Sequence, residues 1–456
     1  MAVLEYLLNF FLGWPLIIYV AIVAVICTFA CGFVQFRYFF KMWSFTLFSE
    51  KSTEKKVKGK VDMTPFQAFV NALNSSLGNG TVAGVATAIY MGGPGSALWL
   101  VITSAFVLAI RYCEVFLSAY FGARTTSKAT IGGPMLYLKQ VVGGKTLAYF
   151  YALFTFTFGL IAGNAIQTNS VGLSVITTLK PWLHISYPTK PWLNVPYIVI
   201  AFIILLFMLY ILLGGAARIV KFSDRIVPVK VGVFFVSALA ILIYHYQNLF
   251  PALKIIFSSA FSSQAIAGGM VGFAVQQAVR RGMSRSIFAT ESGLGTTAIL
   301  FGSTGSNRPV RSGIMSMLAA FISTCACFLM SLCIVASGVW SSGLDSTALT
   351  IASYNTVFGY LGGWIVSFLS ISFGIGVLVT FAYITREAWL YLTGGRLQWM
   401  FAVLYSGFAF WGTIAKVQVV WHIADLVMAG MLIINLFGIL YLLPLIRKEL
   451  RAFSKS

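Results

Sequence analysis

Uncharged polar residues and glycines interrupt an apolar part of the chain in the sequence NSSLGNGT, which runs from Asn74 to Thr81. Glycine and asparagine both lower helix stability, and polar groups at membrane depth need partners or a water-filled cavity. One or two glycines would only permit close helix packing, but here asparagine, serine and threonine accompany them. We therefore expect a helix break at this stretch. The alternative is a tightly packed polar interface.

A helix break of this kind can bind a zwitterion. The half-helix that starts near Asn79 to Ala83 presents backbone N–H groups without intrahelical partners and a partial positive charge, which suit a carboxylate. The half-helix before it ends in free carbonyls, which suit an ammonium group or a sodium ion. Glycine lets the backbone approach a small ligand closely. An amino acid, with one carboxylate and one ammonium group, satisfies both ends.

A second apolar segment, SSQAIAGGMVGFAVQQAVRRGM, is punctuated in a similar way by Gly268, Gly269 and Gly272. We expect a second break near Gly268 to Phe273, which would hold the ammonium group and limit the size of the ligand. Interrupted segments at corresponding positions of two halves indicate the binding site of a membrane transporter.

The composition supplies the membrane-spanning frame that such breaks need. Hydrophobic residues make up 59% of the 456 residues and charged residues 9%, whereas a soluble domain carries about 25% charged residues. The apolar runs are continuous and not alternating, which favours spanning helices over a membrane barrel. We predict an all-α integral membrane protein with eleven spans, near residues 14–35, 64–91, 96–121, 147–175, 196–216, 226–247, 264–283, 312–341, 361–389, 398–418 and 423–446.

The second to sixth predicted spans and the seventh to eleventh form two sets of five. Because five is an odd number of crossings, the second set starts on the opposite side of the membrane, and the two halves are inverted relative to each other. We predict an extra N-terminal helix with a basic cytoplasmic loop over 1–63, a first repeat over 64–247, a second repeat over 264–448 and a cytoplasmic tail over 449–456.

Topology also explains the formal net charge of +20. Lysine and arginine gather in alternate loops, which by the positive-inside rule places the N-terminus outside and the C-terminus in the cytoplasm, in the inner (plasma) membrane. This pattern argues against nucleic acid as a partner and for the lipid bilayer, and it leaves the oligomeric state open. To the loop after the seventh span we assign Arg280, Arg281, Arg285, Arg308 and Arg311.

The six cysteines all fall inside predicted spans, where we expect free, buried, small apolar residues. A metal site at Cys325 and Cys327 has no histidine near it in the sequence. The three histidines are scattered, and no metal-ligand spacing or nucleophile constellation is visible. We therefore expect neither an enzyme nor a cofactor.

Several motifs occur in order along the chain: VAGVATAIYMGGPG at 82–95, RYCE at 111–114, GGPMLYL at 132–138, GNAIQTNS at 163–170, GGAARIVKFSDRIVP at 214–228 and ATESGLGT at 289–296. Together they resemble the alanine or glycine:cation symporter family, the sodium:alanine symporters, over about Pro65 to Leu443. The resemblance implies a LeuT-type five-plus-five inverted repeat preceded by one extra helix. It also implies sodium-driven import of alanine or glycine, with a substrate pocket between spans 2, 4, 7 and 9.

The resemblance further implies substrate-binding residues. Gly78, Asn79, Gly80 and Thr81 occupy the break that cradles the substrate, although the two polar residues are exchanged relative to the family's Gly-Thr-Gly-Asn. Gln167 is the next candidate, because an uncharged amide can bond to either end of a zwitterion. The alternative role of Gln167 is an interhelical hydrogen bond.

At its ninth span the family carries a Ser-Thr pair that is expected to complete a sodium site, whereas this chain has Gly376 and Val377. Neither side chain offers the oxygen ligand that a hard cation needs. Thr380 lies one turn away on roughly the same face and could substitute. The resemblance to the family nevertheless implies sodium as the coupling ion. The alternative is a proton-coupled or cation-independent transporter or exchanger of the same fold.

Three charged residues in or near the predicted spans are candidate gate residues. Arg111 and Glu114 are three residues apart on one helix, close enough to pair, and the alternative is a purely structural ion pair. Glu291 is expected to pair with Arg280, Arg281 or Arg285 and to close an inner gate.

The sequence thus predicts a secondary transporter that imports a small neutral amino acid by alternating access. A channel or receptor built on a transporter fold is the alternative from a different class, and a channel would conduct without saturation. An enzyme is disfavoured because the sequence contains no recognisable acid–base or nucleophile set.

Overall fold

The structure, a computed structural model, describes residues 13–48, 62–124, 132–183, 195–261, 269–415 and 417–455. Every regular element within these ranges is helical, as predicted. Seven of the described helices are long and apolar enough to cross a membrane, which makes this a multi-pass membrane protein. The prediction of eleven spans counts shorter and interrupted segments as well, and it stays a prediction.

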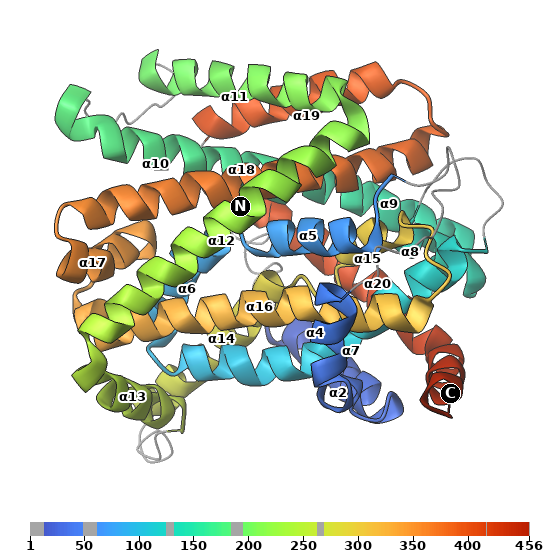
Figure 1. Cartoon of the computed structure of the whole chain (residues 1–456), viewed down its shortest axis with the longest axis horizontal. Coiled ribbons are helices and arrows are strands. Elements are labelled where there is room, and N and C mark those ends of the chain that lie inside the picture. Colours follow the sequence, from blue (N-terminus) through green and yellow to red (C-terminus); the bar gives the residue numbers. More distant parts are fainter. Residues whose placement is uncertain are drawn as a thin grey trace.

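Long helical segments form the frame of the molecule (Figure 1). They are α2 (Trp14–Ala30), α7 (Ser96–Gly122), α9 (Gly144–Leu160) continued by η3 (Ile161–Ala165) and α10 (Ile166–Leu183), α11 (Val195–Leu213), α12 (Gly215–Tyr244), α16 (Pro309–Ala336), α18 (Leu361–Thr393), α19 (Gln398–Ile414) and α20 (Val417–Lys455). Large apolar side chains such as Ile22, Phe202 and Val236 are exposed on α2, α11 and α12. An exposed apolar surface of this extent suits hydrocarbon and not water.

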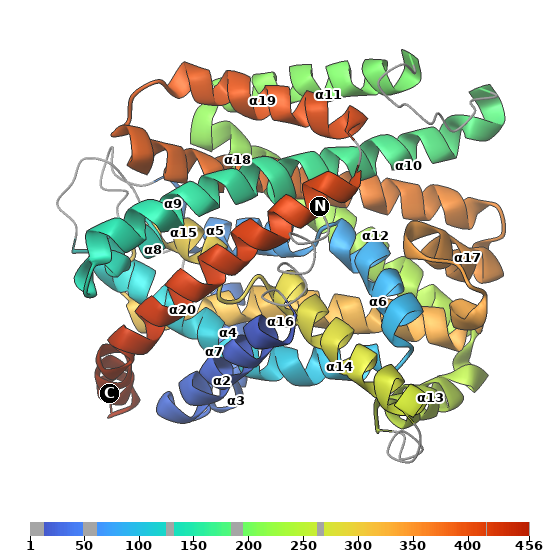
Figure 2. The same ribbon diagram turned by 180° about the vertical axis from the view of Figure 1, so that it is seen from behind.

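Helices at corresponding positions of the two predicted repeats pack against each other: α7 with α16, α10 with α18, and α11 with α19. In both views α11 and α19 lie together as an outer layer next to α18 (Figure 1, Figure 2). The short helix α5 (Pro65–Ser76) packs against α12, α16 and α18, so that its polar end is enclosed by protein.

The break predicted at NSSLGNGT is present. Thr64 and Gln67 start α5 with a capping box, in which the Gln67 N–H donates to Thr64 Oγ1 at 3.2 Å and the Thr64 N–H donates to Gln67 Oε1 at 3.0 Å. After α5 the chain resumes as the π-helical turn η1 (Gly80–Gly84), which continues into α6 (Val85–Gly92). The interruption leaves the last carbonyls of α5 without intrahelical partners.

The second break does not lie where we expected it. α14 (Gly269–Thr290) runs without interruption through Gly272 and Phe273, and Gly268 lies outside the described residues. A glycine inside a helix costs only about 1 kcal/mol, so a helix that gains from packing along its length continues through it. The predicted break near Gly268 to Phe273 is therefore wrong for the described part of this segment.

The chain breaks instead after Thr290, before α15 (Thr296–Gly302). Glu291, Gly293 and Gly295 adopt positive φ angles of 50°, 88° and 78°. Positive φ is incompatible with a right-handed helix of L-residues, which explains why the helix stops here.

Three arginines that we assigned to a cytoplasmic loop, Arg280, Arg281 and Arg285, lie inside α14. Arg280 and Arg281 already fall inside the predicted seventh span, 264–283, and α14 continues past the end of that span to include Arg285. These charges therefore do not belong to the loop pattern on which the predicted orientation rests. Shorter helices also lie outside the predicted spans or at their ends. They are α3 (Val34–Arg37), α4 (Phe39–Leu47), α8 (Pro134–Tyr137), η2 (Leu138–Gln140), η5 (Tyr246–Asn248), α13 (Leu249–Phe261), η7 (Val339–Ser341) and α17 (Ser346–Phe358).

Replacing Gly295 with alanine is expected to lower the melting temperature of the detergent-solubilised protein. A left-handed conformation costs a non-glycine residue about 1–2 kcal/mol, and a Cβ at Gly295 would also overlap Tyr151 and Pro134. Gly407→Ala is the control, because Gly407 lies inside α19 with open space around its Cβ position and alanine favours a helix. Equal melting temperatures for the two variants would contradict the assignment of the second break.

Candidate functional site

The last carbonyl groups of α5 are bound by a lysine from α12. Lys230 donates from Nζ to the carbonyl oxygen of Asn74 at 3.2 Å and to that of Leu77 at 3.1 Å. Its side chain is fully buried. Our sequence analysis missed this residue, although a signal was present: an ionisable residue alone inside an apolar span is a functional candidate by default.

The side chain of Asn74 ties α5 to two further helices. Its Nδ2 donates to Ser223 Oγ on α12 at 3.1 Å, and on α18 to the Gly376 carbonyl at 3.0 Å and to Thr380 Oγ1 at 2.9 Å. Two of the three residues predicted for the sodium region, Gly376 and Thr380, therefore do meet the end of α5. Their oxygen atoms accept hydrogen bonds from a protein side chain.

Gly78 lies in the break between Val377 of α18 and Gln167 of α10. A Cβ at Gly78 would lie 2.8 Å from Val377 Cγ2 and 3.8 Å from Gln167 Oε1. Gln167 Nε2 donates to the Ala162 carbonyl at 3.3 Å, whereas its buried Oε1 has no hydrogen-bond partner among the described residues. An unsatisfied buried acceptor costs about 1–3 kcal/mol, and a donor on a ligand would remove that cost.

Asn79 presents a second buried atom of this kind. Its Oδ1 accepts from Ser370 Oγ at 2.7 Å, and Ser370 accepts in turn from Ser174 Oγ at 2.7 Å. Its Nδ2 is buried and has no acceptor within the described ranges. A Cβ at Gly374 would lie 2.9 Å from this Nδ2. Gly374 thus packs directly against this free donor, where a side chain would collide with Asn79 and Val171.

Arg285 of α14 lies against the two glycines that bound η1. A Cβ at Gly80 or Gly84 would overlap its guanidinium group. The positive charge therefore lies beside the N-terminal end of the helical segment formed by η1 and α6, where backbone N–H groups already favour an anion. Thr81, a predicted site residue, is buried in the same turn, where its Oγ1 accepts from Cys327 Sγ at 3.9 Å.

Three predicted site residues at the start of α14, Gly269, Gly272 and Phe273, are not brought to this break. α14 is 22 residues long, which corresponds to about 33 Å at 1.5 Å per residue. The C-terminal end of α14 is the end that leads to α5, because Glu291 directly after it bonds to Ser75. The predicted ammonium site near Gly269 therefore finds no support in the described residues.

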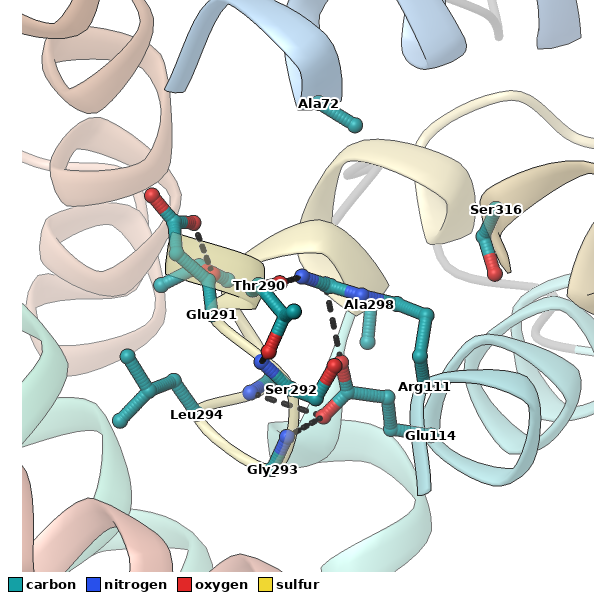
Figure 3. Close-up of polar contacts among 12 residues, drawn as sticks. Ala72, Arg111, Glu114, Thr290, Glu291, Ser292, Gly293, Leu294, Ala298 and Ser316 are labelled. Atoms are coloured by element: carbon teal, nitrogen blue, oxygen red, sulfur yellow. Dashed lines mark hydrogen bonds and ion pairs between the residues drawn. The ribbon is translucent and has the colours of Figure 1, made fainter. Parts of the chain in front are cut away.

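A buried ion pair on α7 braces the second break (Figure 3). Arg111 Nη1 and Glu114 Oε1 lie 3.0 Å apart, and Arg111 Nη2 donates to the carbonyl of Thr290. Glu114 Oε2 accepts from the backbone N–H groups of Gly293 at 3.0 Å and Gly295 at 3.1 Å. The predicted pair is thus present, and it binds backbone groups on both sides of the break.

Glu291 links the second break to the first. Its Oε2 accepts from Thr296 Oγ1 at 2.7 Å and from Ser75 Oγ on α5 at 3.2 Å. The expected ion pair between Glu291 and an arginine of α14 does not form in the described part of the chain, because Glu291 follows the end of that helix and faces α5. The ion pairs found there join Arg111 to Glu114, and Arg386 to Asp62 and Glu387.

The sequence profile of the Sodium:alanine symporter family matches residues 1–456. The chain belongs to this family. It is 30% identical over 403 residues to the sodium/alanine symporter AgcS of Methanococcus maripaludis, covering 86% of this chain and 85% of that protein. It is also 29% identical over 452 residues to an uncharacterized transporter of Haemophilus influenzae, with 98% and 94% covered.

Two further likenesses concern the breadth of the family and the fold. The probable sodium/glutamine symporter GlnT of Bacillus subtilis is 27% identical over 406 residues, 88% of this chain and 80% of that protein. A solved structure of a Na+-coupled sialic acid symporter, substrate-bound and outward-open, has a TM-score of 0.50 at 14% identity, covering 91% of this chain and 82% of that one. The family match and the likeness to AgcS make the chain a cation-coupled amino-acid transporter and not an enzyme, and the solved structure bears on the fold alone.

Replacing Glu114 with glutamine is expected to lower the free energy of unfolding by about 3–5 kcal/mol, because Arg111 would stay buried without its counter-charge. Denaturant unfolding of the purified protein in detergent measures the change. Glu449→Gln on α20 is the matched control, since Glu449 is only partly buried. If the free energy of unfolding fell by the same small amount in both variants, the Arg111–Glu114 pair would not brace the second break.

Proposed function

We propose that the chain carries a small neutral amino acid, alanine or glycine, into the cell by alternating access. The observation that carries this proposal concerns two of the buried polar atoms beside the first break that have no partners among the described residues. One is a donor, Asn79 Nδ2, and the other is an acceptor, Gln167 Oε1. A zwitterionic amino acid brings a carboxylate for the donor and an ammonium group for the acceptor.

The carboxylate of the ligand would lie toward η1. Asn79 directly precedes this turn, whose backbone N–H groups favour an anion. The guanidinium group of Arg285 beside Gly80 and Gly84 adds a charged donor on the same side. The ammonium group would then face Gln167 Oε1 of α10, because Lys230 already binds the carbonyl groups at the end of α5.

Glycines and one valine limit the size of the ligand. A Cβ at Gly78 would lie 2.8 Å from Val377 Cγ2, and one at Gly374 would lie 2.9 Å from Asn79 Nδ2. The residues around Gln167 Oε1 and Asn79 Nδ2 are therefore closely packed and leave only a narrow space. A methyl group or a hydrogen atom fits such a narrow space better than a long side chain. The named relatives support an amino-acid substrate, because one is called a sodium/alanine symporter and another a probable sodium/glutamine symporter.

Alternating access would use the two predicted repeats, over 64–247 and 264–448, with a LeuT-type arrangement and one extra N-terminal helix before them. The packing of α7 with α16, α10 with α18 and α11 with α19 supports such a repeat. Each repeat would open with a broken helix, α5–η1–α6 in the first and α14–α15 in the second. We propose the orientation with the N-terminus outside and the C-terminus in the cytoplasm of the plasma membrane.

The coupling ion has two candidates. The names of relatives favour sodium. The geometry between α5 and α18 favours a proton-coupled or cation-independent mechanism, because Lys230 already places an ammonium group on the carbonyls where a bound ion would be expected.

Replacing Gln167 with methionine is expected to weaken alanine binding at least about tenfold. Methionine keeps the length of the side chain but removes the acceptor, and a hydrogen bond to a charged group contributes about 1.5–3 kcal/mol. Equilibrium binding of radiolabelled L-alanine and glycine to the purified protein measures this, followed by uptake into proteoliposomes.

Gln247→Met is the control for this experiment, because Gln247 is exposed and bonds only to the neighbouring Tyr246. A Gln167→Met protein that binds alanine as tightly as the wild type would rule out this placement of the substrate. Uptake that does not saturate with alanine concentration would contradict a transporter and indicate a channel.

A further inference from the structure

Lys230 carries an ionisable amine into the middle of the protein without an acidic partner among the described residues. Its side chain is fully buried, and the ion pairs of the described residues do not include it. Burying an isolated charge costs several kcal/mol unless other groups replace its hydration. The groups that surround its Nζ must therefore compensate that cost.

Those groups are the kind that bind a metal cation. The carbonyl oxygens of Asn74 and Leu77, at 3.2 Å and 3.1 Å from Nζ, belong to the C-terminal end of α5, where the helix dipole is negative. The ring of Phe373 on α18 faces the same nitrogen, with its centroid 5.1 Å away. Carbonyl oxygens at the end of an interrupted helix are also what coordinates sodium or a proton in transporters of this architecture.

Gly376 of α18 allows the ammonium group of Lys230 to pack directly against the backbone of this helix. A Cβ at Gly376 would lie 2.6 Å from Lys230 Nζ, so any larger residue at this position would press on the ammonium group. Val377, the next residue, has no oxygen in its side chain. Asn74 Oδ1 is buried, has no hydrogen-bond partner in the described ranges, and lies beside the same space at Gly376.

We propose that the ammonium group of Lys230 is a tethered cation that takes the place of a bound sodium ion between α5 and α18. This inference rests on the proposed function, because it concerns the ion that accompanies the amino acid. Sodium has no place at this position while Lys230 fills it, since two cations would compete for the same carbonyl oxygens. Amino-acid binding is therefore independent of sodium.

The first test compares alanine binding to purified wild-type protein in sodium chloride and in choline chloride at equal ionic strength. The expected dissociation constants differ by less than about twofold. A dissociation constant more than about tenfold weaker in choline would overturn the inference and leave the proposed function intact. A protein that binds neither alanine nor glycine in either salt would contradict the proposed function instead.

The second test separates a tethered cation from a mere structural link between α12 and α5. Lys230→Ala opens space at the carbonyls of Asn74 and Leu77, and sodium is expected to restore alanine binding at least about tenfold relative to choline. Lys230→Met fills the same space with an apolar chain, and sodium is expected to restore nothing. If folded Lys230→Ala protein responds to sodium no more than Lys230→Met, the inference is wrong.

Lys221→Ala is the control variant, because Lys221 lies on the same helix and is exposed. It is expected to match the wild type in both salts. Gel filtration of each variant reports whether it is folded, and the salt comparison on the wild type decides the question even if a Lys230 variant does not fold.

Discussion

Unpaired backbone groups at two helix breaks are the constraint on which the rest of the structure depends. Hydrocarbon offers no hydrogen bonds, so every carbonyl and N–H group exposed by a break must find a partner inside the protein. At the first break the partner is a cation, Lys230, on the carbonyls that end α5. At the second it is an anion, Glu114, on the N–H groups of Gly293 and Gly295 that lead into α15.

The two buried charges thus follow one electrostatic rule. A helix ends in a partial negative charge and starts with a partial positive one. At each break, a side chain whose charge is opposite to that of the helix end binds the exposed backbone groups. Lys230 and Glu114 are carried by α12 and α7, which are long and continuous helices and therefore hold both side chains in fixed positions. The breaks also meet directly, because Glu291 accepts a hydrogen bond from Ser75.

Two neutral polar side-chain atoms near the first break have no hydrogen-bond partner among the described residues. Asn79 Nδ2 lies beside Gly374 and Gln167 Oε1 lies near Gly78, both close to the first break. A site with Asn79 Nδ2 as a free donor and Gln167 Oε1 as a free acceptor, near the guanidinium group of Arg285, is electrostatically asymmetric along its length. Such a site matches a zwitterion better than a cation or an anion alone.

The sequence by itself determined the helical, membrane-spanning class, because long apolar runs have one stable solution in lipid. It also determined the first break, since Gly78 and Gly80 among asparagine, serine and threonine are a local signal. Glycine alone was a weaker signal, and the expectation at Gly268 to Phe273 failed because packing carries a helix through isolated glycines. The sequence did not show which residues bind the backbone groups at the two breaks. Lys230 and Leu77 lie 153 residues apart, and only the packing of α12 against α5 and α18 decided that an ammonium group, and not an open set of oxygen ligands, meets the end of the broken helix.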